Sequence, residues 1–115
     1  MHAFTSISAI AEYLIKLNRE NSIGETWTKA QALFHEILNQ TTDAKAIMQL
    51  LEADKEDDLP ISVKTAMFEK LLELNQRTPA LLRMYAAHLW LHGPADDDKV
   101  FELRSEADAL EQHRS

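Results

Sequence analysis

The chain of 115 residues has no cysteine, which excludes disulfide scaffolds, thiolate metal sites, iron–sulfur clusters and cysteine nucleophiles. Glycine and proline are scarce, with 2 and 3 residues, and this scarcity disfavours sheets rich in tight turns and favours helices. No stretch approaches the roughly 18 uninterrupted apolar residues of a membrane span. The first residues lack the basic segment and apolar core of a signal peptide, so we expect a cytoplasmic location.

Basic residues are in deficit, with 12 Lys and Arg against 19 Asp and Glu and a formal net charge of −7. Neutralising phosphates requires clustered Lys and Arg, so this balance argues against nucleic-acid binding. It equally disfavours docking on anionic lipid, and we expect no membrane partner. The length and the 45% of hydrophobic residues predict a single globular domain over residues 1–115.

The sequence contains no recognisable catalytic motif. Two isolated glycines cannot form a phosphate-binding loop. No serine is flanked by glycines, as the nucleophile elbow of a hydrolase requires. We therefore expect a protein that is not an enzyme and carries no cofactor.

Apolar residues recur at helical spacing along almost the whole chain. The pattern predicts six helices, with the approximate ranges 6–21, 26–39, 43–54, 61–75, 79–92 and 96–112. Polar residues able to cap a helix start precede three of them: Thr5 or Ser6, Thr42 or Asp43, and Thr78 ahead of Pro79. Gly93 and Pro94 are expected to end the fifth helix, and Asp96, Asp97 and Asp98 to favour the start of the sixth.

Part of the apolar pattern repeats after 34 residues: Phe34 aligns with Phe68, and Ile37 and Leu38 with Leu71 and Leu72. With this period the chain resembles the tetratricopeptide repeat (TPR) family, and the best match runs from Phe68 to Gly93. The stretch from Trp27 to Leu38 also resembles the family's second helix. One departure is Lys64, which stands where the family has a small residue that lets two helices pack closely.

The resemblance implies an all-α fold of antiparallel helical hairpins, forming a short TPR-like right-handed superhelix of about six helices. The approximate repeats are residues 7–40, 42–75 and 76–112. Four aromatic residues lie in helical apolar stripes and are expected in the core: Trp27, Phe34, Phe68 and Tyr85.

The family's known role implies a protein-interaction module that binds a peptide or a segment of a partner protein. The binding groove would be formed by the first, third and fifth helices. The residues expected to bind the partner are Arg19, Gln49, Arg83, Ala87 and Trp90. The two arginines would pair with carboxylates, Gln49 would bond a peptide backbone, and Trp90 would be the apolar anchor. Further groove-facing positions would be Glu12, Ile15, Ala46, Ala53 and Ala80.

Some of these residues also fit positions that have no binding role. Arg83 fits a merely solvated helix face, and Trp90 fits a core position against the last helix. His35, beside the apolar stripe of the second helix, is interpreted as a satisfied or solvated histidine.

Two other functions are alternatives. A short repeat array leaves apolar end faces, so a self-assembling structural subunit, a homo-oligomer, is one of them. The other is a small metal-binding bundle, because His88 and His92 are four apart on one helix, with Asp96 to Asp98 just beyond the turn. The usual zinc-protease glutamate is missing between these histidines, and we expect two partly exposed histidines and no metal.

The acidic segment 52–58 imitates part of a calcium loop through Asp54, Glu56 and Asp58. It lacks the glycine of such a loop, and Thr65 stands where the bidentate glutamate belongs. The segment is therefore predicted to be a solvated helix end followed by an acidic loop.

Overall fold

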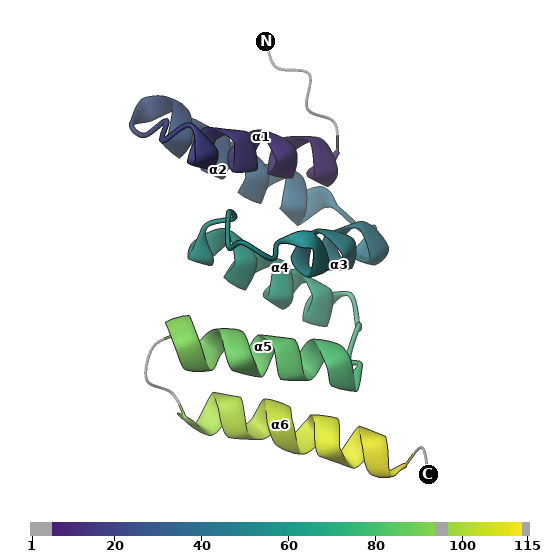
Figure 1. Cartoon of the computed structure of the whole chain (residues 1–115). Coiled ribbons are helices and arrows are strands. Elements are labelled where there is room, and N and C mark those ends of the chain that lie inside the picture. The colour runs from purple at the N-terminus through teal and green to yellow at the C-terminus, as the bar shows by residue number, and fades with distance from the viewer. Residues whose placement is uncertain (1–5, 94–96, 114–115) are drawn as a thin grey trace. The chain divides into compact units, whose positions relative to one another are not determined.

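The computed structural model describes residues 6–93 and 97–113, and this part of the chain contains six α-helices and no strand (Figure 1). The helices are α1 (Ile7–Arg19), α2 (Glu25–Gln40), α3 (Ala44–Ala53), α4 (Ile61–Glu73), α5 (Pro79–His92) and α6 (Asp97–Gln112). The prediction of an all-α fold with about six helices is confirmed. None of the described helices is long and apolar enough to span a bilayer.

The predicted capping residues begin three of the helices. The side chains of Ser6, Asp43 and Thr78 accept hydrogen bonds from backbone amides in the first turns of α1, α3 and α5, at 3.2, 3.1 and 3.2 Å. Each bond satisfies one of the amides that a helix start leaves unpaired. Pro94 and Asp96, expected to end α5 and to begin α6, lie outside the described residues.

Two helices end two residues earlier than the sequence predicts. The expected ends were Asn21 and Asn75, but α1 ends at Arg19 and α4 at Glu73. Both asparagines have left-handed backbone conformations, with φ of 56° and 63°. Asparagine adopts this conformation more easily than most residues, and it ends the helical hydrogen-bond pattern.

The chain divides into two compact units, Met1–Leu74 with α1 to α4 and Asn75–Ser115 with α5 and α6. We call these unit 1 and unit 2. The division falls beside the predicted boundary between the second and third repeats.

In unit 1, α1 packs against α2 and α3, while α4 packs against α2 and α3 from the other side (Figure 1). The core consists of apolar side chains from all four helices, and the largest fully buried ones are Ile10, Leu14, Phe34, Ile47, Val63, Met67 and Leu71. The predicted core positions of Phe34 and Phe68 are confirmed, whereas Trp27 is only half-buried. The buried side chain of Lys70 reaches from α4 to the C-terminal end of α2, where its Nζ donates a 2.9 Å hydrogen bond to the carbonyl of Asn39.

In unit 2, α5 and α6 lie side by side and run in opposite directions (Figure 1). Leu82, Ala86 and Tyr85 of α5 are buried, as are Val100, Leu103 and Ala107 of α6. Arg77, just before α5, donates a 2.7 Å hydrogen bond to Glu106 of α6. The burial of Tyr85 confirms its predicted core position.

Candidate partner-binding surfaces

On unit 1, the guanidinium group of Arg19 is already paired within the chain. Its Nε and Nη2 atoms donate hydrogen bonds of 3.1 and 2.8 Å to Oδ2 of Asp58, and Asn18 donates one of 3.2 Å to Oδ1. These bonds lower the pKa of Asp58 and raise that of Arg19, mainly through the Arg19–Asp58 hydrogen bond. The end of α1 is thereby tied to the loop between α3 and α4, so a partner carboxylate would have to compete with Asp58 for Arg19.

The loop between α3 and α4 is held by a buried carboxylate. Asp54, whose side chain is 2% exposed, accepts hydrogen bonds from the backbone amides of Asp58 and Leu59 at 2.8 and 3.3 Å. Its Oδ2 also forms an ion pair with Nζ of Lys64 in α4 at 2.8 Å. The same Nζ contacts the exposed Asp57 as well. Burial opposes the charged form of Lys64, but its bonds to the two carboxylates outweigh burial and raise its pKa. The prediction of a solvated helix end is therefore wrong for Asp54, which caps the end of α3.

The exposed side of α1 is hollowed. A cavity of about 390 Å³ is lined by Glu12, Ile15, Lys16, Arg19 and Glu20. Glu12, Ile15 and Arg19 are the three positions of this helix that the resemblance assigns to a groove. Gln49 of α3 is exposed in the same unit, so it is available to a partner.

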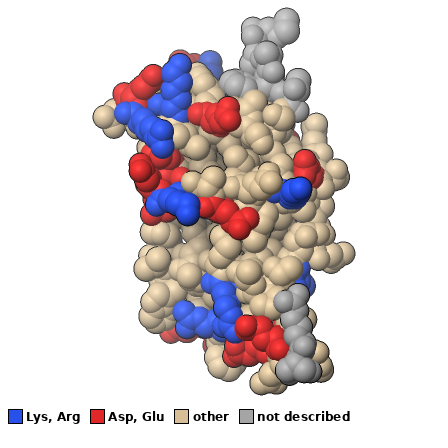
Figure 2. All heavy atoms as spheres, turned by 45° about the vertical axis from the view of Figure 1, so that its right-hand side comes forward, with Lys and Arg blue, Asp and Glu red and all other residues tan. Residues whose placement is uncertain are grey.

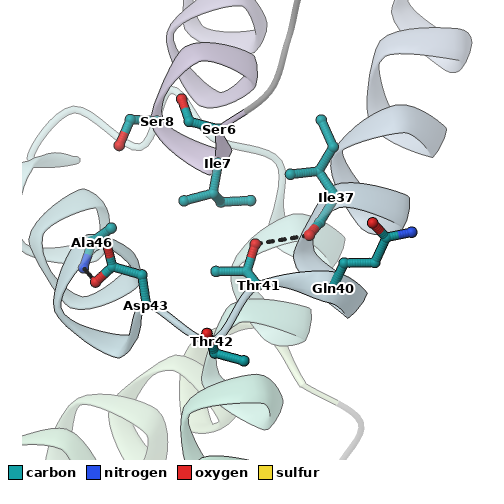
Figure 3. Close-up of a pocket in the computed structure, with 9 residues that line it drawn as sticks. All are labelled: Ser6, Ile7, Ser8, Ile37, Gln40, Thr41, Thr42, Asp43 and Ala46. Atoms are coloured by element: carbon teal, nitrogen blue, oxygen red, sulfur yellow. Dashed lines mark hydrogen bonds between the residues drawn. The ribbon is translucent and has the colours of Figure 1, made fainter.

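A second cavity of about 560 Å³ opens where α1 and α3 begin and α2 ends (Figure 3). Three of its polar side chains form hydrogen bonds at the helix ends: Ser6 and Asp43 cap α1 and α3, and the Thr41 hydroxyl donates a 2.7 Å hydrogen bond to the carbonyl of Ile37. Ile7 and Ala46 supply apolar lining. The arrangement explains the helix ends without a ligand.

On unit 2, Arg83 of α5 lies in a cluster with two carboxylates of α6. Its Nη2 donates a 2.6 Å hydrogen bond to Asp108, and Nε donates one of 3.1 Å to Glu111, which Nη2 also contacts. The pKa of Arg83 is raised, first by the bond to Glu111 and then by that to Asp108. Arg83 is thus not a merely solvated residue, and it joins the two helices of its hairpin.

Trp90 lies on the outside of unit 2, so the alternative of a core position against the last helix is wrong. Trp90 is 63% exposed, and Leu91 and Phe101, on either side of the turn between α5 and α6, are 72% and 70% exposed. The guanidinium carbon of Arg104 lies 6.0 Å from the centre of the Trp90 ring, within cation–π range. Phe101 precedes Arg104 by one helical turn and therefore neighbours it on the surface of α6.

Three of the five predicted binding residues share one exposed face. Arg83, Ala87 and Trp90 are spaced by four and three along α5, and all are exposed. Arg19 and Gln49 belong to unit 1.

We name the exposed surface around Trp90, Leu91, Phe101 and Arg104 the aromatic patch.

The aromatic patch contains two residues that were not among the predicted binding residues, Phe101 and Arg104. Phe101 lies outside the apolar stripe of α6, which contains Val100, Leu103 and Ala107. A large apolar residue outside the stripe of an amphipathic helix was the signal that could have identified it.

The two histidines of α5 differ in exposure. His88 is buried and His92 is exposed, and their ring centres lie 5.5 Å apart. The expectation of two partly exposed histidines is therefore wrong for His88. Within residues 6–93 and 97–113 no three or more His, Asp or Glu side chains gather as a metal site would need. His35 is half-buried, and its ring packs edge-on against Phe34 at 6.2 Å.

Charges of opposite sign are mixed on the surface. Acidic and basic side chains lie next to one another in small groups on the face that Figure 2 shows. The ion pairs of Arg19, Lys64, Arg77 and Arg83 have this character. On the face shown, no broad basic area is available to neutralise a nucleic-acid backbone.

No protein-family model, curated protein or solved structure matches the chain.

Proposed function

We propose that the protein is an interaction module that binds a segment of a protein partner on the aromatic patch of unit 2. The observation that carries the proposal is the exposure of Trp90, Leu91 and Phe101 together at one end of the α5–α6 hairpin. Single exposed apolar side chains are ordinary, but several large ones exposed at one end of a hairpin are typical of a binding surface. Tryptophan and arginine are also among the residue types most enriched among those that dominate binding energy.

The surroundings of Trp90 suit an anchor residue. Arg104 lies against its ring and restricts the orientations that the side chain can adopt before a partner arrives. Ala87, one turn earlier on α5, adds little bulk, so a partner chain can approach the helix closely there. Binding therefore needs little ordering of the aromatic patch, which lowers its entropic cost.

Arg83 has a different role in this proposal from the one that the family resemblance implies. Its guanidinium is paired with Asp108 and Glu111 of the same chain. Arg83 therefore orders the surface beside the aromatic patch and does not bind a carboxylate of the partner. On unit 1, Arg19 is engaged by Asp58 in the same way. Gln49 and the hollow along α1 form a second surface for polar contacts with the same partner or another.

The test is affinity capture from cells that make the protein, comparing wild type with Trp90→Ala and Ile23→Ala. Ile23 is the matched control, because it is also a large exposed apolar residue but lies in unit 1. We expect a retained protein that Trp90→Ala loses and Ile23→Ala keeps, with equal helicity by circular dichroism. If all three proteins retain the same set, or none retains anything, the aromatic patch is not a binding surface.

A further inference from the structure

We infer that the partner of the aromatic patch is a second copy of this chain, with the two α6 helices antiparallel about a two-fold axis at Phe101. The inference rests on the proposed function and names the partner for the same surface. The order of charged and aromatic residues along one face of α6 supports this pairing.

Asp97, Phe101 and Arg104 share this face, because they are spaced by four and three residues along the helix. All three side chains are exposed. From Asp97 to Arg104, this face therefore carries an acidic group, an aromatic ring and a basic group in that order.

This order is complementary to itself when it is reversed. With a rise of about 1.5 Å per residue, Arg104 lies roughly 4.5 Å beyond Phe101 along the axis and Asp97 roughly 6 Å before it. A two-fold axis through Phe101 brings each Arg104 to within roughly 1.5 Å, along the axis, of the other copy's Asp97. A parallel pairing would instead place Arg104 against Arg104.

Both charges are available for this contact. Of the four arginines in the described part of the chain, Arg19, Arg77 and Arg83 form ion pairs with carboxylates of the same chain. Arg104 pairs with no carboxylate among the described residues and lies over Trp90 instead. Asp97 likewise forms no ion pair within residues 6–93 and 97–113, so the second copy supplies what each lacks.

The surface area that two copies would bury indicates a weak, concentration-dependent dimer. Aromatic side chains cover about 150–250 Å² each, so the exposed parts of Trp90 and Phe101 amount to roughly 200–300 Å² per copy. Two copies together with Leu91 and the flanking charged residues would bury about 1,000 Å², the lower end of specific interfaces. We expect a dissociation constant on the order of micromolar.

Charge reversal tests the pairing by sedimentation velocity over a micromolar-to-millimolar concentration series. Arg104→Glu leaves two acidic groups on the face, and Asp97→Arg leaves two basic groups, so each variant alone should dimerise at least about tenfold more weakly than wild type. An equimolar mixture of the two variants should associate again, because each copy then offers the charge that the other needs. Glu102→Arg is the matched control for Asp97→Arg, since it makes the same charge change at an exposed position of α6. Glu102 follows Phe101 by one residue and precedes Arg104 by two, so it lies off the face and its variant should dimerise like wild type.

The inference is overturned if wild type stays monomeric throughout, if the single reversals dimerise as well as wild type, or if the mixture does not associate. A monomeric wild type that still captures another protein through Trp90 overturns the dimer and leaves the proposed function intact. A monomeric wild type with no Trp90-dependent capture overturns both.

Discussion

Replacing Asp54 by Asn should lower the stability of unit 1 far more than a substitution in an acidic loop normally does. The Asp54 carboxylate accepts two backbone amides and the ammonium of Lys64 while its side chain is only 2% exposed. Asparagine keeps one acceptor oxygen of similar shape but loses the charge and the second acceptor. The backbone of the loop and the Lys64 ammonium are then left partly unsatisfied.

The magnitude follows from this geometry. Breaking a buried ion pair by removing one partner costs about 3–5 kcal/mol, and Lys64 keeps Asp57 as a second partner, so the lower end applies. We expect Asp54→Asn to lower the free energy of unfolding by about 3 kcal/mol. For a domain the size of unit 1 this corresponds to a fall in Tm of roughly 12–24 °C.

Asp57→Asn is the matched control. Asp57 contacts the same ammonium, but its side chain is 76% exposed, and exposed pairs contribute about 0–1 kcal/mol. Asparagine also tolerates the left-handed conformation at this position, φ 54°. Urea unfolding followed by far-UV circular dichroism measures both variants, and equal losses for the two would refute the assignment of Asp54 as the group that holds the loop.

Three further predictions concern the helix ends and the Arg19–Asp58 pair. Gly93→Ala should lower the free energy of unfolding by about 1–3 kcal/mol, because an added Cβ would lie 2.7 Å from the backbone oxygen of Leu89; an unchanged urea midpoint would contradict this. Thr78→Ala should lose about 1 kcal/mol in the same assay, because it removes the N-cap of α5, while Thr78→Ser should retain it. The lowered folded pKa of Asp58 means that its pair with Arg19 stabilises the protein above the unfolded pKa near 4, and that this stability is lost as the pH falls through the folded pKa. In urea midpoints measured from about pH 6 to pH 2, Arg19→Ala should therefore lose less stability on acidification than wild type, and parallel curves would contradict the pairing.

Local features of the fold were predictable from the sequence. The caps at Ser6, Asp43 and Thr78 act within three residues, so the residue types alone predicted each cap to within one position. The burial of Phe34 and Phe68 followed from their places in apolar stripes. The predicted helix ends at Asn21 and Asn75 failed by two residues, because an apolar period cannot show where an asparagine turns left-handed.

The candidate site was only partly predictable. Arg83, Ala87 and Trp90 share a face by their spacing alone, and all three are exposed as expected. The engagement of Arg83 by Asp108 and Glu111 could not be foreseen, because these residues lie 25 and 28 positions away. Arg104 was overlooked for the same reason, since its relation to Trp90 exists only when α5 and α6 pack together.

Local sequence patterns are enough to specify the helical content, the number of helices, their capped starts and the apolar stripe of each. These features depend on interactions within one or two turns of a helix, so they do not depend on which helices pack together. The tertiary structure alone decided which charges are satisfied and which apolar residues stay outside. It made Asp54 a buried acceptor, joined Arg19 to Asp58 across 39 positions, and left Trp90 and Phe101 exposed. The physical reason is that burial and ion pairing depend on which helix faces meet, and no period along the chain records that.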